Sequence, residues 1–110
     1  MNDEATDGWT YIFEAYCLSR LERYSEAIAQ QVTGMNLIER SDPLDYYNLA
    51  CFNALGRNEE AALRNLERAI ELGGELYRKH AAKDPDITLL REAGKLEALI
   101  GTDVPEGEAP

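Results

Sequence analysis

The sequence predicts an all-α fold, a short α-solenoid of antiparallel helical hairpins. Apolar residues recur at intervals of three and four residues through most of the chain, and no segment alternates with a period of two for long enough to form a strand. Asp-Pro and Gly-Gly pairs stand where helices are expected to begin and end. Residues in the first half also recur 35 positions later. A chain of 110 residues suits one domain.

The clearest helical pattern covers residues 58–72. Five apolar side chains there share one face at helical spacing: Ala62, Leu63, Leu66, Ala69 and Ile70. Charged residues lie largely off that face. Asn58 is a suitable N-cap, and the pair Gly73-Gly74 supplies the left-handed residue with which many helices end.

Turn signals divide the rest of the chain. Asp42-Pro43 is expected to start a helix that ends at Gly56, and Asp84-Pro85 to start a C-terminal helical region that Gly94 divides. Further helices are predicted at residues 9–21, 25–38 and 75–83. The chain is thus divided into five parts: a flexible leader (1–8), a first hairpin (9–40), a second hairpin (41–74), C-terminal capping helices (75–100) and a disordered acidic tail (101–110).

The two predicted hairpins repeat one pattern. Six pairs share the 35-residue offset: Tyr11 and Tyr46, Ala15 and Ala50, Ala27 and Ala62, Gly34 and Ala69, Met35 and Ile70, and Leu37 and Leu72. Three of the pairs are small residues in helix interiors. A small side chain at a fixed position lets two helix backbones approach closely, so the repeat predicts stacked hairpins that cross at these residues.

Several stretches resemble the tetratricopeptide repeat, whose period is about 34 residues. Arg-Tyr-Ser-Glu-Ala-Ile at 23–28 is similar to the start of that family's second helix. Residues 47–51, 54–61 and 67–72 are similar to the two halves of a second copy. The resemblance covers residues 9–74 and implies two tetratricopeptide-like repeats that serve as a scaffold for protein–protein interaction.

The first copy departs from the family pattern. Glu22 stands where a turn glycine is usual, Gln31 replaces a large apolar residue, and Gly34 replaces alanine. A third copy is excluded because Pro85 stands where a helix interior would be needed. Two repeats cannot easily bury their last face. We therefore expect six C-terminal apolar residues to cover the second repeat, with a dimer contact as their alternative role: Leu89, Leu90, Ala93, Leu96, Leu99 and Ile100.

Composition narrows the classes of partner. The net charge is −10, from 21 acidic and 11 basic residues, and such a surface repels nucleic acid and anionic membranes. No apolar run approaches the roughly 18 residues needed to span a bilayer, and the acidic N-terminus is unlike a secretory signal. The expected location is cytoplasmic, with Cys17 and Cys51 reduced.

The sequence offers no set of catalytic or metal-binding residues. The single histidine, His80, stands among basic residues and is expected at the surface. Neither cysteine has a second cysteine at CxxC spacing. We therefore expect no cofactor, no metal and no enzymatic activity.

The family resemblance implies a concave groove lined by the first helix of each repeat. The matching positions are Ile12, Tyr16, Ser19 and Arg20 in the first copy, and Tyr47, Asn48, Cys51 and Leu55 in the second. Tyrosine and arginine are frequent anchors in protein interfaces. Asn48 resembles one member of the clamp that holds chaperone tails in some members of the family, but the lysines of that clamp have no match.

Three functions remain at this point. The groove of an adaptor or chaperone-like scaffold would bind a peptide or helix of another protein. Alternatively, the chain is a structural unit that forms a homodimer through its groove or its C-terminal helices. A regulatory module that acts with an enzyme is the third alternative.

Overall fold

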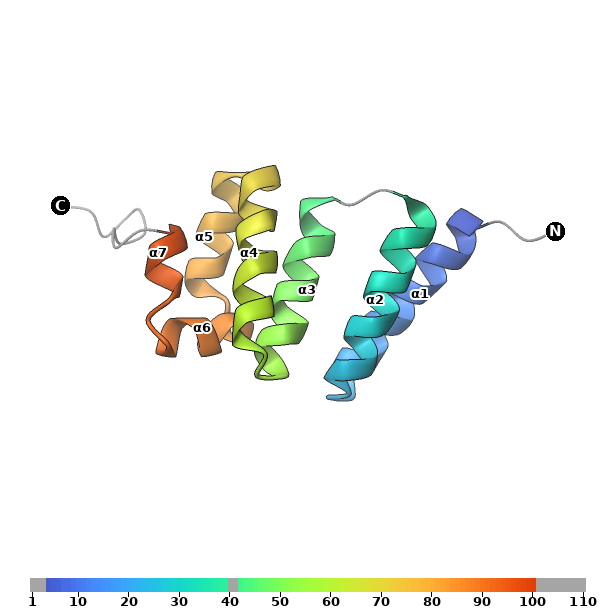
Figure 1. The fold of residues 1–110 in the computed structure, drawn as a ribbon, viewed down its shortest axis with the longest axis horizontal. Coiled ribbons are helices and arrows are strands. Elements are labelled where there is room, and N and C mark those ends of the chain that lie inside the picture. Colours follow the sequence, from blue (N-terminus) through green and yellow to red (C-terminus); the bar gives the residue numbers. More distant parts are fainter. Residues whose placement is uncertain (1–3, 40–41, 101–110) are drawn as a thin grey trace.

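The computed structural model describes residues 4–39 and 42–100, and the regular structure in these ranges is entirely helical. The elements are α1 (Glu4–Arg20), α2 (Tyr24–Ile38), α3 (Pro43–Leu55), α4 (Glu59–Gly73), α5 (Glu75–Lys83), the 3₁₀ helix η1 (Pro85–Ile87), α6 (Thr88–Glu92) and α7 (Leu96–Ile100). The helices stand side by side in a row, with α1 and α2 at one end and α5 to α7 at the other (Figure 1). The prediction of an all-α chain of antiparallel hairpins is confirmed.

The first hairpin pairs α1 with α2 through two glycines. A Cβ atom on Gly34 would lie 2.6 Å from the carbonyl oxygen of Gly8, and one on Gly8 would lie 2.9 Å from that of Gly34. The helices therefore approach to backbone contact, which only glycine permits. This contact explains why position 34 is a glycine, although glycine is unfavourable in the interior of an isolated helix.

The N-terminal boundary of the first hairpin differs from the prediction. α1 begins at Glu4, whereas the sequence predicted a flexible leader over residues 1–8 and a helix from Trp9. Gly8 is buried within the helix and packs on Gly34 and Ile38. This tertiary contact extends the helix into residues that we had assigned to the flexible leader. Residues 1–3 and the predicted tail 101–110 lie outside the described residues.

The second hairpin begins and ends at the predicted turn residues. The backbone N–H of Asp42 donates to Asp45 Oδ2 at 3.0 Å, which caps α3 ahead of Pro43. The turn between α3 and α4 is closed by the Asn58 N–H, which donates to the carbonyl of Asn53 at 2.7 Å. Gly74, with a φ of 72°, ends α4.

Small residues at the repeat positions are buried throughout both hairpins. Ala15 and Ala27 are fully buried in the first hairpin, and Ala50 and Ala62 are fully buried in the second. Gly34 and Ala69 are buried as well. The internal repeat therefore corresponds to equivalent positions in the two hairpins.

The main core joins α3 and α4 to the C-terminal helices. Its buried side chains include Leu66, Ile87, Leu90 and Leu96, and Leu89, Leu99 and Ile100 pack against them. Five of the six predicted C-terminal residues thus cover the second hairpin. Ala93, the sixth, is exposed because it follows the end of α6 ahead of the turn at Gly94. Ile87, which the sequence analysis did not single out, is fully buried.

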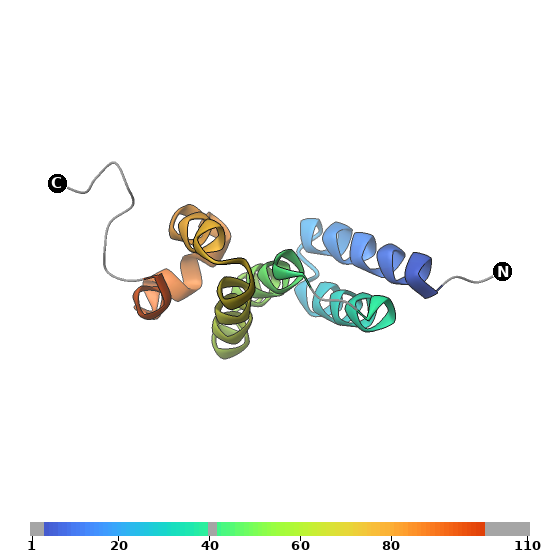
Figure 2. The same cartoon turned by 90° about the horizontal axis from the view of Figure 1, so that it is seen from above.

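A smaller cluster connects the two hairpins. Phe52 of α3 packs with Ala15 and Ala27, against the half-buried Leu18 and Ile28. Figure 2 shows that α3 lies beside this first hairpin, whereas α5 to α7 lie on the other side of α3 and α4. Phe52 therefore supplies the buried apolar contact between α3 and the first hairpin.

Candidate functional site

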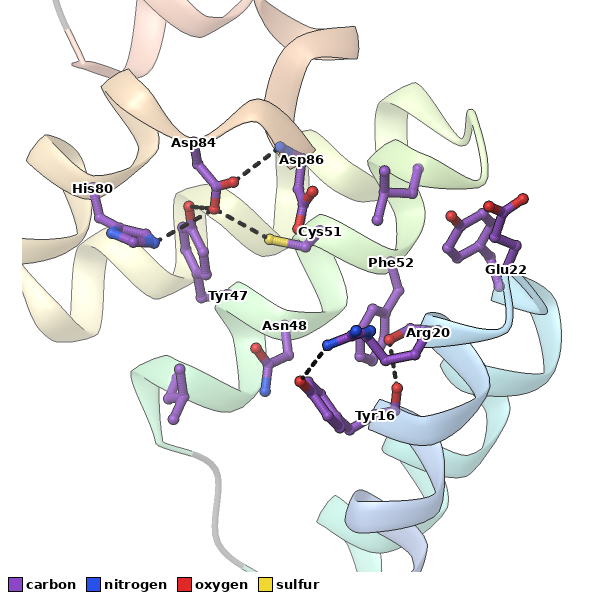
Figure 3. A pocket seen from close by; sticks show the side chains of 14 residues that line it. Tyr16, Arg20, Glu22, Tyr47, Asn48, Cys51, Phe52, His80, Asp84 and Asp86 are labelled. Atoms are coloured by element: carbon purple, nitrogen blue, oxygen red, sulfur yellow. Dashed lines mark hydrogen bonds and ion pairs between the residues drawn. The ribbon is translucent and has the colours of Figure 1, made fainter.

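A cavity of about 510 Å³ lies between the first hairpin, α3 and the segment that follows α5 (Figure 3). Seven of the eight predicted groove residues line it: Tyr16, Ser19, Arg20, Tyr47, Asn48, Cys51 and Leu55. The remaining lining residues are Glu22, Tyr24, Leu44, Phe52, His80, Asp84 and Asp86. Residues that are far apart in the sequence thus meet in one cavity.

Ile12 is the predicted groove residue that the structure places elsewhere. It is half-buried, and its Cγ1 atom lies 2.7 Å from the position that a Cβ on Gly34 would take. Ile12 therefore packs on α2 and does not line the cavity. The close approach of α1 and α2 at Gly34 turns this position of the helix inward.

The wall formed by α1 presents an aromatic and cationic pair. Arg20 Nη1 donates to the Tyr16 hydroxyl at 3.0 Å, and its guanidinium carbon lies 5.9 Å from the centre of the Tyr16 ring. The Ser19 hydroxyl donates to the Tyr16 carbonyl at 2.7 Å. Tyr16 is 53% exposed, so about half of its surface is available to a ligand. Such pairs combine apolar area, charge and hydrogen-bonding groups.

The opposite wall is organised around the carboxylate of Asp84. The Tyr47 hydroxyl donates to Asp84 Oδ2 at 2.6 Å, and the Cys51 thiol lies 3.8 Å from the same oxygen. The Asp86 N–H donates to Asp84 Oδ1 at 2.9 Å, and His80 Nε2 lies 3.5 Å from Oδ2. Asp84 therefore ties α3 and α5 to the start of η1. The dashed lines in Figure 3 mark these contacts.

Ionisation is suppressed on this wall. Burial raises the pKa of the Tyr47 hydroxyl, and the hydrogen bond to Asp84 adds to the effect. Burial and the charge of Asp84 likewise raise the pKa of the Cys51 thiol. Both groups thus remain protonated and act as hydrogen-bond donors. A protonated, buried thiol is a poor nucleophile and a poor metal ligand.

Three side chains of the same wall are close enough together to ligate a metal ion. Ligand atoms of Cys51, Asp84 and Asp86 lie within 4.8 Å of one another. A metal would have to displace the thiol proton of Cys51 and compete with the donors that already occupy Asp84. The hydrogen bonds account for this cluster without a metal.

The sequence analysis missed the acidic part of the cavity. We interpreted Asp84-Pro85 only as the start of a helix and His80 only as a surface residue. His80 is indeed exposed, but its ring lies 5.2 Å from that of Tyr47, and Asp84 is largely buried. These contacts join residues 33 and 37 positions apart, so no helical periodicity reveals them.

No known protein family matches the chain, and no curated protein or solved structure matches it either. Among the helices that the structure describes, none has the length and apolar character needed to cross a membrane.

Proposed function

We propose that this chain is a non-catalytic interaction module of the tetratricopeptide type, which binds a peptide or helix of another protein in the cavity described above. One observation carries the proposal. Residues selected from two separate copies of the repeat, seven of the eight predicted, line a single cavity. Convergence of this kind is expected of a binding groove built from successive hairpins.

The charges of the cavity favour a partner with basic side chains. Asp86 and Glu22 line the cavity, and Asp84 adds a third carboxylate. Burial and the neighbouring Asp84 raise the pKa of Asp86, so a cation placed there would stabilise its ionised form. The net charge of −10 attracts the same class of partner over longer distances. Tyr16 and Leu44 offer apolar area for an adjacent side chain.

The α1 wall is the better place to test this proposal. Tyr47 is only 4% exposed and contributes to the core, so replacing it would also destabilise the fold. Tyr16 and Glu22 are both exposed, and their replacement alters the cavity without creating a void. The variant Tyr16→Ala/Glu22→Lys therefore separates binding from stability.

The experiment is affinity capture from the native host with wild-type and variant baits, followed by mass spectrometry. Glu67→Lys, at an exposed position on α4, is a control with the same charge reversal outside the cavity. Proteins that bind in the cavity should be recovered with the wild type and with Glu67→Lys, and depleted at least tenfold with Tyr16→Ala/Glu22→Lys. Equal recovery with all three baits would remove binding from this cavity.

A further inference from the structure

The C-terminal end of α5 lacks the backbone donors that would continue the helix. In an α-helix, each carbonyl accepts a hydrogen bond from the N–H of the residue four positions later. For Ala81 that position is Pro85, which has no N–H. For Ala82 it is Asp86, whose N–H instead donates to Asp84 Oδ1 at 2.9 Å. Both carbonyls therefore have no donor within their own helix.

Arg91 of α6 supplies a donor to this end of α5. Its Nη2 atom donates to the carbonyls of Ala81 at 3.1 Å and Ala82 at 3.0 Å, and it lies 3.4 Å from the carbonyl oxygen of Asp84. The positive charge of the guanidinium also suits the C-terminus of a helix, where the peptide dipoles leave a partial negative charge. One side chain thus holds both the end of α5 and the residue that follows it.

The residue held in this way carries the carboxylate at the centre of the acidic wall. The Asp84 side chain is only 11% exposed, and a buried carboxylate is costly unless its hydrogen bonds are made. Figure 3 shows this side chain pointing at Tyr47 and Cys51. The carboxylate reaches these partners only while the backbone of Asp84 keeps its place at the end of α5.

The apolar contacts nearby do not fix that place by themselves. Ile87 and Leu90 are fully buried in the main core and anchor η1 and α6 to it. Burial of apolar side chains is non-directional, however, whereas a hydrogen bond fixes the direction of the carbonyl that accepts it. The contacts of Arg91 are therefore the ones that orient the chain at Asp84.

We propose that Arg91 is a positioning residue for the cavity: it holds the end of α5 so that the Asp84 carboxylate stays on the Tyr47 hydroxyl. Arg91 does not itself line the cavity, so it acts through the backbone of Asp84. The helix α6 then has a second role besides covering the core. The rival explanation is a cap that stabilises α5 without any effect on Tyr47.

A double-mutant cycle distinguishes the two explanations. Arg91→Met removes the charge and the donors but keeps an unbranched apolar side chain, and Tyr47→Phe removes only the hydroxyl. A positioning role means that Arg91→Met already weakens the contact of that hydroxyl with Asp84. In the Arg91→Met background, Tyr47→Phe should therefore lower Tm by no more than about half as much as in the wild type. Arg64→Met, at an exposed position of α4 outside the cavity, is the matched control and should leave the effect of Tyr47→Phe unchanged.

Exchange of the Tyr47 hydroxyl proton with water, measured by NMR, is a readout that a cap of α5 alone would not alter. The signal is identified by its loss in Tyr47→Phe. Exchange should be roughly tenfold faster in Arg91→Met than in the wild type or in Arg64→Met. Arg91→Lys keeps the charge and the donors of one nitrogen, so its rate should lie between those of the wild type and Arg91→Met.

Two results would overturn the positioning role: losses in Tm that simply add in the cycle, or a hydroxyl that exchanges as slowly in Arg91→Met as in the wild type. Circular dichroism at the temperature of measurement shows whether each variant is folded. Should Arg91→Met not fold, Arg91→Lys decides, and a wild-type exchange rate in that variant would overturn the role. All of these measurements use the free protein. A failed capture experiment would therefore count against binding in the cavity and not against the role of Arg91.

Discussion

Replacing Gly34 by alanine has two opposing effects on the free energy of unfolding. Alanine is favoured over glycine in a helix interior by about 1 kcal/mol. The added Cβ, however, would lie 2.6 Å from the Gly8 carbonyl oxygen and 2.7 Å from a carbon of Ile12. The first of these is a backbone atom of another helix, so it cannot move aside by a change of rotamer.

The packing effect is the larger of the two. Restoring ordinary contact requires α1 and α2 to separate by roughly 0.8 Å at this crossing, and a gap of that size loses about a quarter to a half of the dispersion energy of each contact it opens. Overpacked sites typically cost about 1–3 kcal/mol, and a backbone obstacle places Gly34 near the upper end. Subtracting the gain in helix propensity leaves a net loss of about 2 kcal/mol for Gly34→Ala.

Thermal and urea unfolding, followed by circular dichroism and by fluorescence of the single tryptophan, Trp9, measures this loss. A loss of about 2 kcal/mol lowers Tm by roughly 10 °C in a domain of this size. Ala29→Gly, at an exposed position of the same helix, is the control. It should lower the free energy of unfolding only by the difference in helix propensity between alanine and glycine. A Gly34→Ala variant as stable as the wild type would refute the close approach of the two helices.

Three further predictions concern the second hairpin, the junction and the acidic wall. Ala62→Arg should abolish cooperative unfolding, because a charge forced into a fully buried crossing costs on the order of 4 kcal/mol or more; an unchanged Tm would contradict the burial of Ala62. Gln31→Leu should raise the free energy of unfolding by about 1 kcal/mol, because the buried Gln31 Oε1 accepts no hydrogen bond from the described residues; a clear loss in urea unfolding would show that this amide is well paired. Asp86→Asn should raise Tm at neutral pH and lose that advantage as the pH falls. The pKa of Asp86 is raised in the folded state, so folding is favoured while Asp86 is protonated and disfavoured once it ionises; a difference in Tm that stayed constant from pH 7 to pH 3 would refute this assignment.

The hairpins were predictable because their signals are local. Apolar periodicity, the Asp42-Pro43 start and the glycines at the end of α4 each act within one helix or turn, and the structure follows them closely. The start of α1 was predicted wrongly for the opposite reason. Within its own segment Gly8 favours the end of a helix, and only its contact with Gly34, 26 residues later, makes it favourable. Such a contact has no local signature.

The residues of the candidate site likewise fall into those that the sequence revealed and those that it did not. Tyr16, Arg20 and Cys51 were found because the family resemblance assigns them by position within a repeat. Asp84 and Asp86 belong to no repeat, and they reach the cavity because the chain after α5 packs against α3 at Tyr47 and Cys51. Asp84-Pro85 did indicate a helix start. The Asp84 carboxylate that caps this start also accepts a hydrogen bond from the Tyr47 hydroxyl.

The two walls of the cavity belong to different parts of the core. The wall that carries Asp84 is fixed by hydrogen bonds to α3 and by the main core beneath it. The wall that carries Tyr16 belongs to the first hairpin, which is joined to the rest through the small cluster around Phe52. A ligand that contacts both walls therefore adds to the few contacts that hold the hairpins together. Binding in this cavity should consequently stabilise the junction between the hairpins more than either hairpin alone, since the contacts that the ligand adds span that junction.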